Sequence, residues 1–480
     1  MTYQLPVTAG RLQAAGLAIV LLALAGSLAH TYRYLWFSDA ANWYYFGRTF
    51  AQGFSEQALA YGFPLLVAAG TGLVGPLWGW FVNVPVLLLL CALVFRLAQV
   101  QMPAATRGHP GWAAAAGFLA IALLVGAGET RFQTLANPYR DALAHARLLG
   151  AALLLVRFAE GTPRSWRALV ASALCLAFAA STRETSVLAL PSFLLFGVLA
   201  SRARGEGTLA PVGVFAAVFA LACVPLLVQN ALVSGNPLVP AQAAESYARS
   251  GIPVPGVRLR FFSETAGGVL GLLAERWTAL GVGVALIGAG AGVWQRNRVL
   301  VALCLPLALT HLLFYASYAR PVPRYLFVID VVLWPMVAAG LVGLVARASV
   351  ALPRDRLATA AAVAGFALAL VAVGLRAPAT DAVALADFRR MREALQELPA
   401  GGLVLAEHPE SLALRAFGPL DLEFWARAGA DRALSRHEHR EAVRARATTS
   451  PAAWYVTLDP EREHAPLREL LGSFSRIEAM

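Results

Sequence analysis

The sequence predicts an all-α polytopic membrane protein with about eleven transmembrane helices, interfacial helices in the first outer loop and a small carboxy-terminal α/β domain. Of its 480 residues, 58% are hydrophobic and only 14% are charged. Soluble proteins carry about a quarter charged residues. The apolar residues also gather in runs of about 18–22, the length that crosses a bilayer. This composition excludes a disordered chain, a nucleic-acid-binding domain and a conventional cytosolic enzyme.

The apolar runs divide the chain into a membrane domain, residues 1–375, and a carboxy-terminal domain, residues 376–480. The runs are 11–30, 77–98, 111–128, 139–158, 165–181, 185–202, 208–229, 278–294, 299–317, 324–346 and 357–375. The first run is long and its amino-terminal flank holds only Arg11, so we expect an uncleaved anchor.

The distribution of arginine predicts the orientation. All 39 basic residues are arginine and the net charge is +11. With a cytoplasmic amino terminus, thirteen arginines lie in the short inner segments and seven in the short outer loops, in agreement with the positive-inside rule. We therefore expect an integral protein of a bacterial inner membrane, with an extracytoplasmic carboxy-terminal domain, membrane lipids as neighbours and no nucleic-acid partner.

Three outer segments are long enough to contribute to function: residues 31–76, 230–277 and 376–480. Within the last segment, 381–398 and 460–471 have the pattern of amphipathic helices. Residues 402–407 and 454–459 have the pattern of strands. These elements are the basis for expecting a small α/β domain.

Asp39 stands at the start of a candidate helix in the first outer segment. Trp43, Phe46, Phe50 and Phe54 follow at spacings of three and four, which predicts an apolar stripe on a helix in the membrane interface. Asp39 could act as a general base toward the aqueous side, or it could be an ordinary helix N-cap. Position alone does not separate the two interpretations.

Two further acids open later spans on the same face. Asp141 ends the motif Asn-Pro-Tyr-Arg-Asp, in which Asn and Pro favour a helix start and the carboxylate suits the helix dipole. Arg140 beside it could bind an anion such as a lipid phosphate. Ser181 and Glu184 have the spacing of a capping box, which is the local alternative to a role in the site.

Polar residues also occur elsewhere in the outer loops and inside the spans. Arg320 and Arg324 flank a proline-stiffened turn, where they could bind phosphate or anchor helices. Asp330 lies within a span, so we expect it to be functional or paired, either with Arg147 or with an outer arginine. His145 lies in the same span as Arg147.

Cysteine and histidine give little support for a metal site or a disulfide framework. Cys91, Cys175, Cys223 and Cys304 lie in separate apolar runs, so we expect small buried hydrophobes. In the motif His437-Glu438-His439, residues two apart point away from each other on a helix. We expect no metal ligands there.

The motifs, taken in order, resemble the GT-C superfamily of polytopic glycosyltransferases, in the branch of protein mannosyltransferases and bacterial aminoarabinose transferases. The resemblance covers most of residues 10–350. It rests on Asp39 to Phe54, Tyr61-Gly-Phe-Pro64, Asn137-Pro-Tyr-Arg-Asp141, Thr182-Arg-Glu-Thr-Ser186, Gly235-Asn-Pro-Leu238 and Arg320-Pro-Val-Pro-Arg-Tyr325. Many relatives carry two adjacent acids in the first loop, whereas Ala40 follows Asp39 here. Whether the enzyme uses a divalent cation therefore stays open.

The resemblance implies an enzyme that transfers a sugar, with inversion, from a polyprenyl-phosphate donor to a lipid, glycan or protein acceptor on the extracytoplasmic side. Asp39 would be the base and Asp141 the second catalytic acid. Arg140, Arg320 and Arg324 would hold the donor phosphate. Supporting roles fall to Arg183, Glu184, Asn236 and Tyr325. A transporter or flippase of an anionic lipid or solute, and a non-catalytic scaffold, are the alternatives.

Overall fold

Helices make up nearly all of the chain that the structure, a computed structural model, describes. The described residues are 7–32, 60–74, 82–103, 106, 109–126, 140–161, 165–239, 286–288, 290–291, 299–316, 326–349, 354–375, 403–406, 421–424 and 453–456. Within a bilayer the backbone has no water to bond, so apolar runs of this length form helices.

The helices follow the apolar runs closely. They are α1 (Val7–Tyr32), α3 (Gly62–Val74), α5 (Asn83–Gln101), α7 (Pro110–Gly126), α9 (Arg140–Glu160), α10 (Trp166–Thr182), the 3-10 helix η2 (Glu184–Ala189), α11 (Leu190–Arg202), α12 (Leu209–Ser234), the π-helix η3 (Leu300–Cys304), α16 (Leu305–Ala316), α17 (Phe327–Ala348) and α18 (Arg354–Leu375). Ten of the eleven expected runs fall on these helices. Of the remaining run, 278–294, the described residues 286–288 and 290–291 are helical.

The chain is an integral membrane protein. Within its described part, seven helices are long and apolar enough to cross a membrane, and three more apolar helices are shorter. Most of α17, α9 and α5 is buried, whereas only a small part of α1, α12 and α18 is buried. The exposed side chains of these outer helices are large and apolar, such as Leu22, Leu221 and Leu368, as expected where a helix faces lipid tails.

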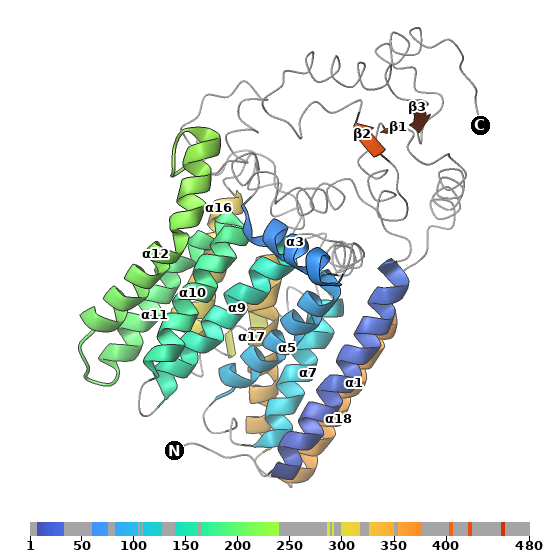
Figure 1. Ribbon diagram of the computed structural model, residues 1–480. Helices are drawn as coiled ribbons and strands as arrows, with labels where there is room; N and C mark the ends of the chain where they lie inside the picture. The colour runs from blue at the N-terminus through green and yellow to red at the C-terminus, as the bar shows by residue number, and fades with distance from the viewer. Residues whose placement is uncertain are drawn as a thin grey trace. The chain divides into compact units, whose positions relative to one another are not determined.

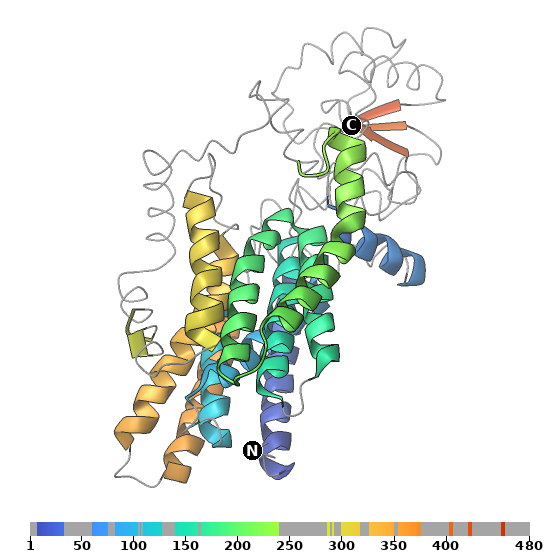
Figure 2. The same cartoon turned by 90° about the vertical axis from the view of Figure 1, so that its left-hand side faces the viewer.

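The buried helices lie at the centre of the bundle. α9 packs against α5 and α10, and α5 packs against α7 and α17. α10 is also in contact with α12, and α16 is in contact with α17 and η2. Figure 1 shows these helices running along one another, and the quarter turn in Figure 2 shows α12 reaching past its neighbours at the end away from the amino terminus.

Glycine allows α7 to approach two neighbours closely. A Cβ atom on Gly111 would lie 2.7 Å from the backbone of Ala358 on α18, and one on Gly117 would overlap the ring of Phe95 on α5. Small residues at such contacts let helix backbones meet, which is the main source of packing between helices in lipid.

Polar contacts tie the helix ends together at the end of the bundle expected to be cytoplasmic. The side-chain amide of Gln13 donates from Nε2 to the carbonyl of Pro110 at 2.6 Å, and Nε2 of His109 lies 2.8 Å from the carboxylate of Asp355. Arg204 donates to the carbonyl of Gly161 at 3.0 Å. The segments that the arginine count assigns to the inner side therefore lie at the same end of the bundle. This is expected when consecutive helices cross the membrane in alternating directions.

Three short strands lie in the carboxy-terminal part, within a second compact unit that includes residues 379–480. β1 (Leu403–Ala406) pairs in parallel with β2 (Asp421–Phe424) and β3 (Ala453–Val456), in the order β2-β1-β3. β1 and β3 overlap the two expected strands, while β2 was not predicted. The helices expected at 381–398 and 460–471 lie outside the described residues, so the α/β domain stays a prediction.

Candidate active site

The candidate site is built where α9 begins and α10 ends. Ser165 caps α10 by accepting a hydrogen bond from the amide of Ala168 at 3.3 Å. After Thr182 the chain becomes extended at Arg183, with φ −146° and ψ 114°, and then enters η2. This break in the helical path places two consecutive charged residues, Arg183 and Glu184, opposite the first turn of α9.

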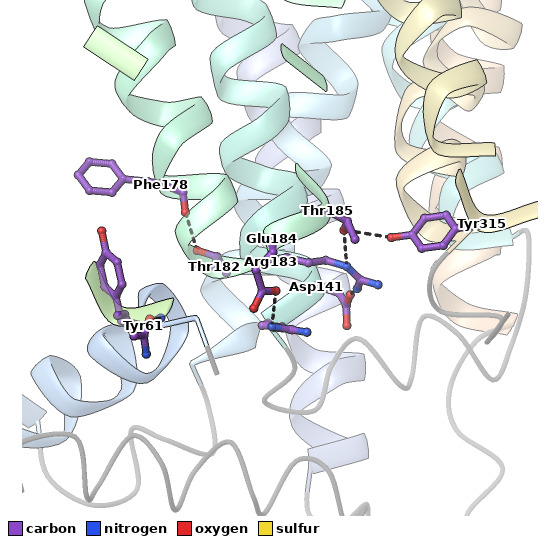
Figure 3. A network of polar contacts seen from close by, with 10 residues as sticks. Tyr61, Asp141, Phe178, Thr182, Arg183, Glu184, Thr185 and Tyr315 are labelled. Carbon is purple, nitrogen blue, oxygen red and sulfur yellow. Dashed lines mark hydrogen bonds and ion pairs between the residues drawn. The ribbon is translucent and has the colours of Figure 1, made fainter. Parts of the chain in front are cut away.

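Two ion pairs join these helix ends, and Figure 3 labels three of their four residues, Asp141, Arg183 and Glu184. Arg183 pairs with Asp141, and the guanidinium of Arg140 lies 3.0 Å from the carboxylate of Glu184. Two consecutive residues at the start of α9 therefore bind the two consecutive residues that follow α10, and the four charges sum to zero. Because α9 and α10 run in opposite directions, Arg140 and Asp141 meet Glu184 and Arg183 in reverse order.

The Arg183–Asp141 pair is held by further contacts. Arg183 donates from Nε to the hydroxyl of Thr185 at 3.1 Å, and the same hydroxyl accepts from Tyr315 of α16 at 3.1 Å. The guanidinium also lies over the ring of Tyr315, 6.0 Å from its centre. Figure 3 shows Thr185 between Arg183 and Tyr315. These contacts fix the direction of Arg183 and connect α16 to the site.

A second set of contacts fixes the last turn of α10. Arg147, two turns into α9, donates to the hydroxyl of Thr182 at 2.5 Å and to the carbonyl of Phe178 at 3.0 Å. Its guanidinium lies 5.7 Å from the centre of the Phe178 ring. An arginine inside a span is stable only with such partners. Among the described residues Arg147 forms no ion pair with Asp330; the other partner considered for Asp330 is an outer arginine, and several of these lie outside the described residues.

The motif Tyr61-Gly62 docks on the same turn. The hydroxyl groups of Tyr61 and Ser181 lie 3.1 Å apart, and the Tyr61 amide donates to the side chain of Gln229 on α12 at 3.2 Å. A Cβ atom on Gly62 would lie 2.6 Å from the hydroxyl of Thr182. Glycine at this position therefore permits the close approach, and Tyr61 labelled in Figure 3 marks where it occurs.

The capping box expected from Ser181 and Glu184 is not formed. Ser181 donates to the carbonyl of Ala177 within its own helix, and Glu184 faces Arg140. The residue that caps η2 is Arg183, whose side chain makes no capping hydrogen bond. The spacing was correct for a box, but Ser181 is still helical here, so its hydroxyl cannot serve a new helix start.

Asn236 closes a turn after α12. Gly235, in the left-handed conformation with φ +75°, ends the helix. The carboxamide oxygen of Asn236 accepts from the amide of Leu238 at 3.0 Å, while Asn230 donates to the carbonyl of Pro237 at 3.2 Å. The described geometry thus gives Asn236 a structural contact within this turn. Its supporting role in the site stays a prediction.

Several expected site residues fall outside the described part of the chain. They are Asp39, Arg320, Arg324 and Tyr325. The motif His437-Glu438-His439, for which no metal was expected, also lies outside the described residues. Asp330 and His145 are described, and both are buried within spans. Among the described residues, no group of three or more His, Cys, Asp or Glu side chains could hold a metal ion.

Some residues of the described network were not predicted. Thr185, Tyr315 and Tyr61 make side-chain hydrogen bonds around the ion pairs. Thr185 directly follows the Arg-Glu pair, and Tyr61 opens one of the quoted motifs, so both stood within recognisable segments. Tyr315 is separated from Thr185 by 130 positions. Only the packing of α16 against η2 brings it to the site.

A solved structure, ArnT, shares the arrangement of these helices, which agrees with the GT-C fold expected from the motifs. ArnT from Cupriavidus metallidurans, solved bound to undecaprenyl phosphate, is similar with a TM-score of 0.57 and 14% identity, over 92% of this chain and 89% of ArnT. No protein-family model and no curated protein sequence matches the chain.

Two other solved structures share less of the fold. The archaeal oligosaccharyltransferase AglB from Archaeoglobus fulgidus, in complex with an inhibitory peptide and a dolichol-phosphate, has a TM-score of 0.48 and 13% identity, over 87% of this chain and 65% of AglB. The arabinosyltransferase EmbB from Mycobacterium smegmatis has a TM-score of 0.45 and 15% identity, over 87% of this chain and 44% of EmbB.

Proposed function

We propose that this protein is a membrane glycosyltransferase that moves a sugar from a polyprenyl-phosphate carrier to an acceptor hydroxyl on the extracytoplasmic side. The observation that carries the proposal is the fold shared with ArnT along 92% of the chain. ArnT was solved with undecaprenyl phosphate bound, and a polyprenyl phosphate is the carrier proposed here. The ion-paired end of the bundle supports the proposal, since it brings together the arginines and acids of two quoted segments, Asn137–Asp141 and Thr182–Ser186.

In the proposed reaction Asp39 takes the proton of the acceptor hydroxyl while the hydroxyl oxygen attacks the anomeric carbon. The bond between this carbon and the phosphate oxygen breaks, its electrons go to the oxygen, and the configuration inverts. Arg140, Arg320 and Arg324 stabilise the charge that develops on the leaving phosphate, because guanidinium groups form paired hydrogen bonds to phosphate. Asp141 is the second acid of this site, and Arg183, Glu184, Asn236 and Tyr325 support it.

The first test is sugar transfer by the purified protein in proteoliposomes, with a panel of hexosyl and pentosyl polyprenyl-phosphate donors. Replacing a general base costs about 10²- to 10⁴-fold in rate, so we expect Asp39→Asn to reduce turnover within this range. Asp355→Asn is the matched control, because Asp355 is exposed at the opposite end of the bundle. An Asp39→Asn variant as fast as the wild type would show that the base is another group.

A transporter of an anionic lipid or solute is the second candidate. The buried positions of Asp330 and His145 within spans favour it, because ionisable groups at membrane depth often line transport paths. Accumulation of a labelled lipid phosphate across sealed vesicles, without transfer of sugar, would support transport. Sugar transfer in detergent, where no compartments exist, would support the enzyme.

A further inference from the structure

The two ion pairs at the outer end of α9 and α10 have the same chemistry but different surroundings. The side chains of Arg183 and Asp141 are 5% and 4% exposed, whereas those of Arg140 and Glu184 are 13% and 15% exposed. Because the Arg140–Glu184 pair reaches solvent, its charges stay partly solvated when it opens, while the more buried pair cannot be opened without leaving charges unsolvated. The Arg140–Glu184 pair is therefore the one that can exchange partners.

The contacts of Arg183 point to the same division. Its guanidinium is bound to Thr185, lies over Tyr315 and pairs with Asp141. An anion that recruited Arg183 would have to break this set inside the protein. Arg140 instead meets Glu184 at the start of η2, a short 3-10 helix in which Glu184 is the first residue. Glu184 can turn away without disturbing a helix interior.

A carboxylate and a phosphate bind a guanidinium in the same way, through two nearly parallel hydrogen bonds. Glu184 and a phosphate group therefore compete for Arg140. The phosphate carries at least as much charge and more acceptor oxygens. It can displace the carboxylate, while the carboxylate remains ready to take its place again.

We propose that Glu184 is an exchangeable counter-ion of Arg140. The phosphate group of the polyprenyl carrier displaces Glu184 when it binds, and Glu184 pairs with Arg140 again when the carrier leaves. This inference rests on the proposed function. In this proposal Glu184 sets the affinity for the carrier, and the Asp141–Arg183 pair beside it stays intact.

The test measures the affinity of the full-length protein in nanodiscs for polyprenyl phosphate. Glu184→Gln keeps the shape of the side chain and removes the competing charge, so we expect the dissociation constant to fall about three- to tenfold. Arg140→Gln should weaken binding, and the double variant should bind as weakly as Arg140→Gln alone. Glu206→Gln is the matched control, since Glu206 is exposed between α11 and α12 and its affinity should equal that of the wild type.

Three further probes separate the sources of the effect. Polyprenol, which lacks the phosphate, should bind the wild type and Glu184→Gln equally. Competition by inorganic phosphate would show that Arg140 accepts either source of the group, and its absence would restrict the exchange to the lipid headgroup; both agree with the proposal. Glu184→Asp keeps the charge but moves it away from Arg140, so its affinity should lie between those of the wild type and Glu184→Gln. Binding tighter than that of Glu184→Gln would assign the effect to packing and overturn the proposal.

The outcomes also separate this proposal from the proposed function. If the folded wild type binds polyprenyl phosphate but Glu184→Gln binds it equally or more weakly, the exchange is wrong and the carrier assignment stands. If the folded wild type binds no polyprenyl phosphate, both are wrong. Glu184→Ala provides the same comparison in case the glutamine variant does not fold.

Discussion

At the scale of single residues, Asp141 and Asp355 show how burial changes the role of a carboxylate. Asp141 faces Arg183 with both side chains at most 5% exposed, while Asp355 is 94% exposed beside His109. Removing one partner of a buried pair leaves the other charge without water or counter-ion. Removing one partner of an exposed pair leaves a solvated group.

We expect Asp141→Asn to lower the free energy of unfolding by about 3–5 kcal/mol, the usual effect of breaking a buried ion pair. The measurement is the thermal unfolding midpoint in detergent, followed with a thiol-reactive dye or by intrinsic fluorescence. Asp355→Asn, the same chemical change at an exposed site, should leave the midpoint close to that of the wild type. Equal midpoints for the two variants would show that Arg183 has another counter-charge.

The sequence identified both partners of each ion pair but not the pairing. Arg140-Asp141 and Arg183-Glu184 were placed on the same outer face, and each had a plausible local explanation as a helix start. The pairing depends on how α9 and α10 align along their lengths, which no local pattern specifies. One signal was present: in an antiparallel hairpin of helices, two Arg-acid dipeptides meet with each positive charge facing a negative one.

At the scale of elements, hydropathy predicted the membrane helices well because the bilayer leaves the backbone few alternatives. It did not predict that residues 185–202 begin with a 3-10 turn before α11, nor that residues 300–304 form a π-helix. Such changes of pitch are decided by side-chain contacts and proline position. The helix α3 within the first outer segment was expected only in general terms, and the apolar stripe from Trp43 to Phe54 lies outside the described residues.

The contact between α7 and α18 predicts a contrast between two glycines. In Gly111→Ala the new methyl group would meet the backbone of Ala358 at 2.7 Å, so the helices must separate, at a cost of about 1–3 kcal/mol. A Cβ on Gly150 of α9 would meet nothing within 4 Å, and alanine there should stabilise the helix by about 0.5–1 kcal/mol. Opposite shifts in the unfolding midpoint are the expected result. A shift of the same sign in both variants would contradict the described contact.

At the scale of the whole molecule, the alternating direction of the helices predicts which segments face each side of the membrane. α12 has 26 residues, or about 39 Å at 1.5 Å per residue, enough to cross a hydrocarbon core of about 30 Å. The residues before and after it, Glu206 and Leu238, therefore lie on opposite sides. The excess of arginine in inner segments predicts that Glu206 is cytoplasmic.

Single cysteines introduced at Glu206 and Leu238 test this topology. The background replaces all four native cysteines with alanine: Cys91, Cys175, Cys223 and Cys304. Leu238 is 80% exposed, so a membrane-impermeant maleimide added to intact spheroplasts should label the Leu238→Cys variant. The same reagent should label the Glu206→Cys variant only after permeabilisation. The reverse pattern would invert the orientation of the whole chain and move the ion-paired site to the cytoplasm.

The turn after α12 has a practical consequence. Ser234 lies within hydrogen-bonding distance of three carbonyl oxygens, those of Asn230, Asn236 and Val239, so the turn closes on its own helix. These local contacts hold the carboxy-terminal end of α12 within the described residues. We therefore expect α12 to tolerate an epitope tag inserted directly after this turn, and the predicted orientation would place the tag on the outer face.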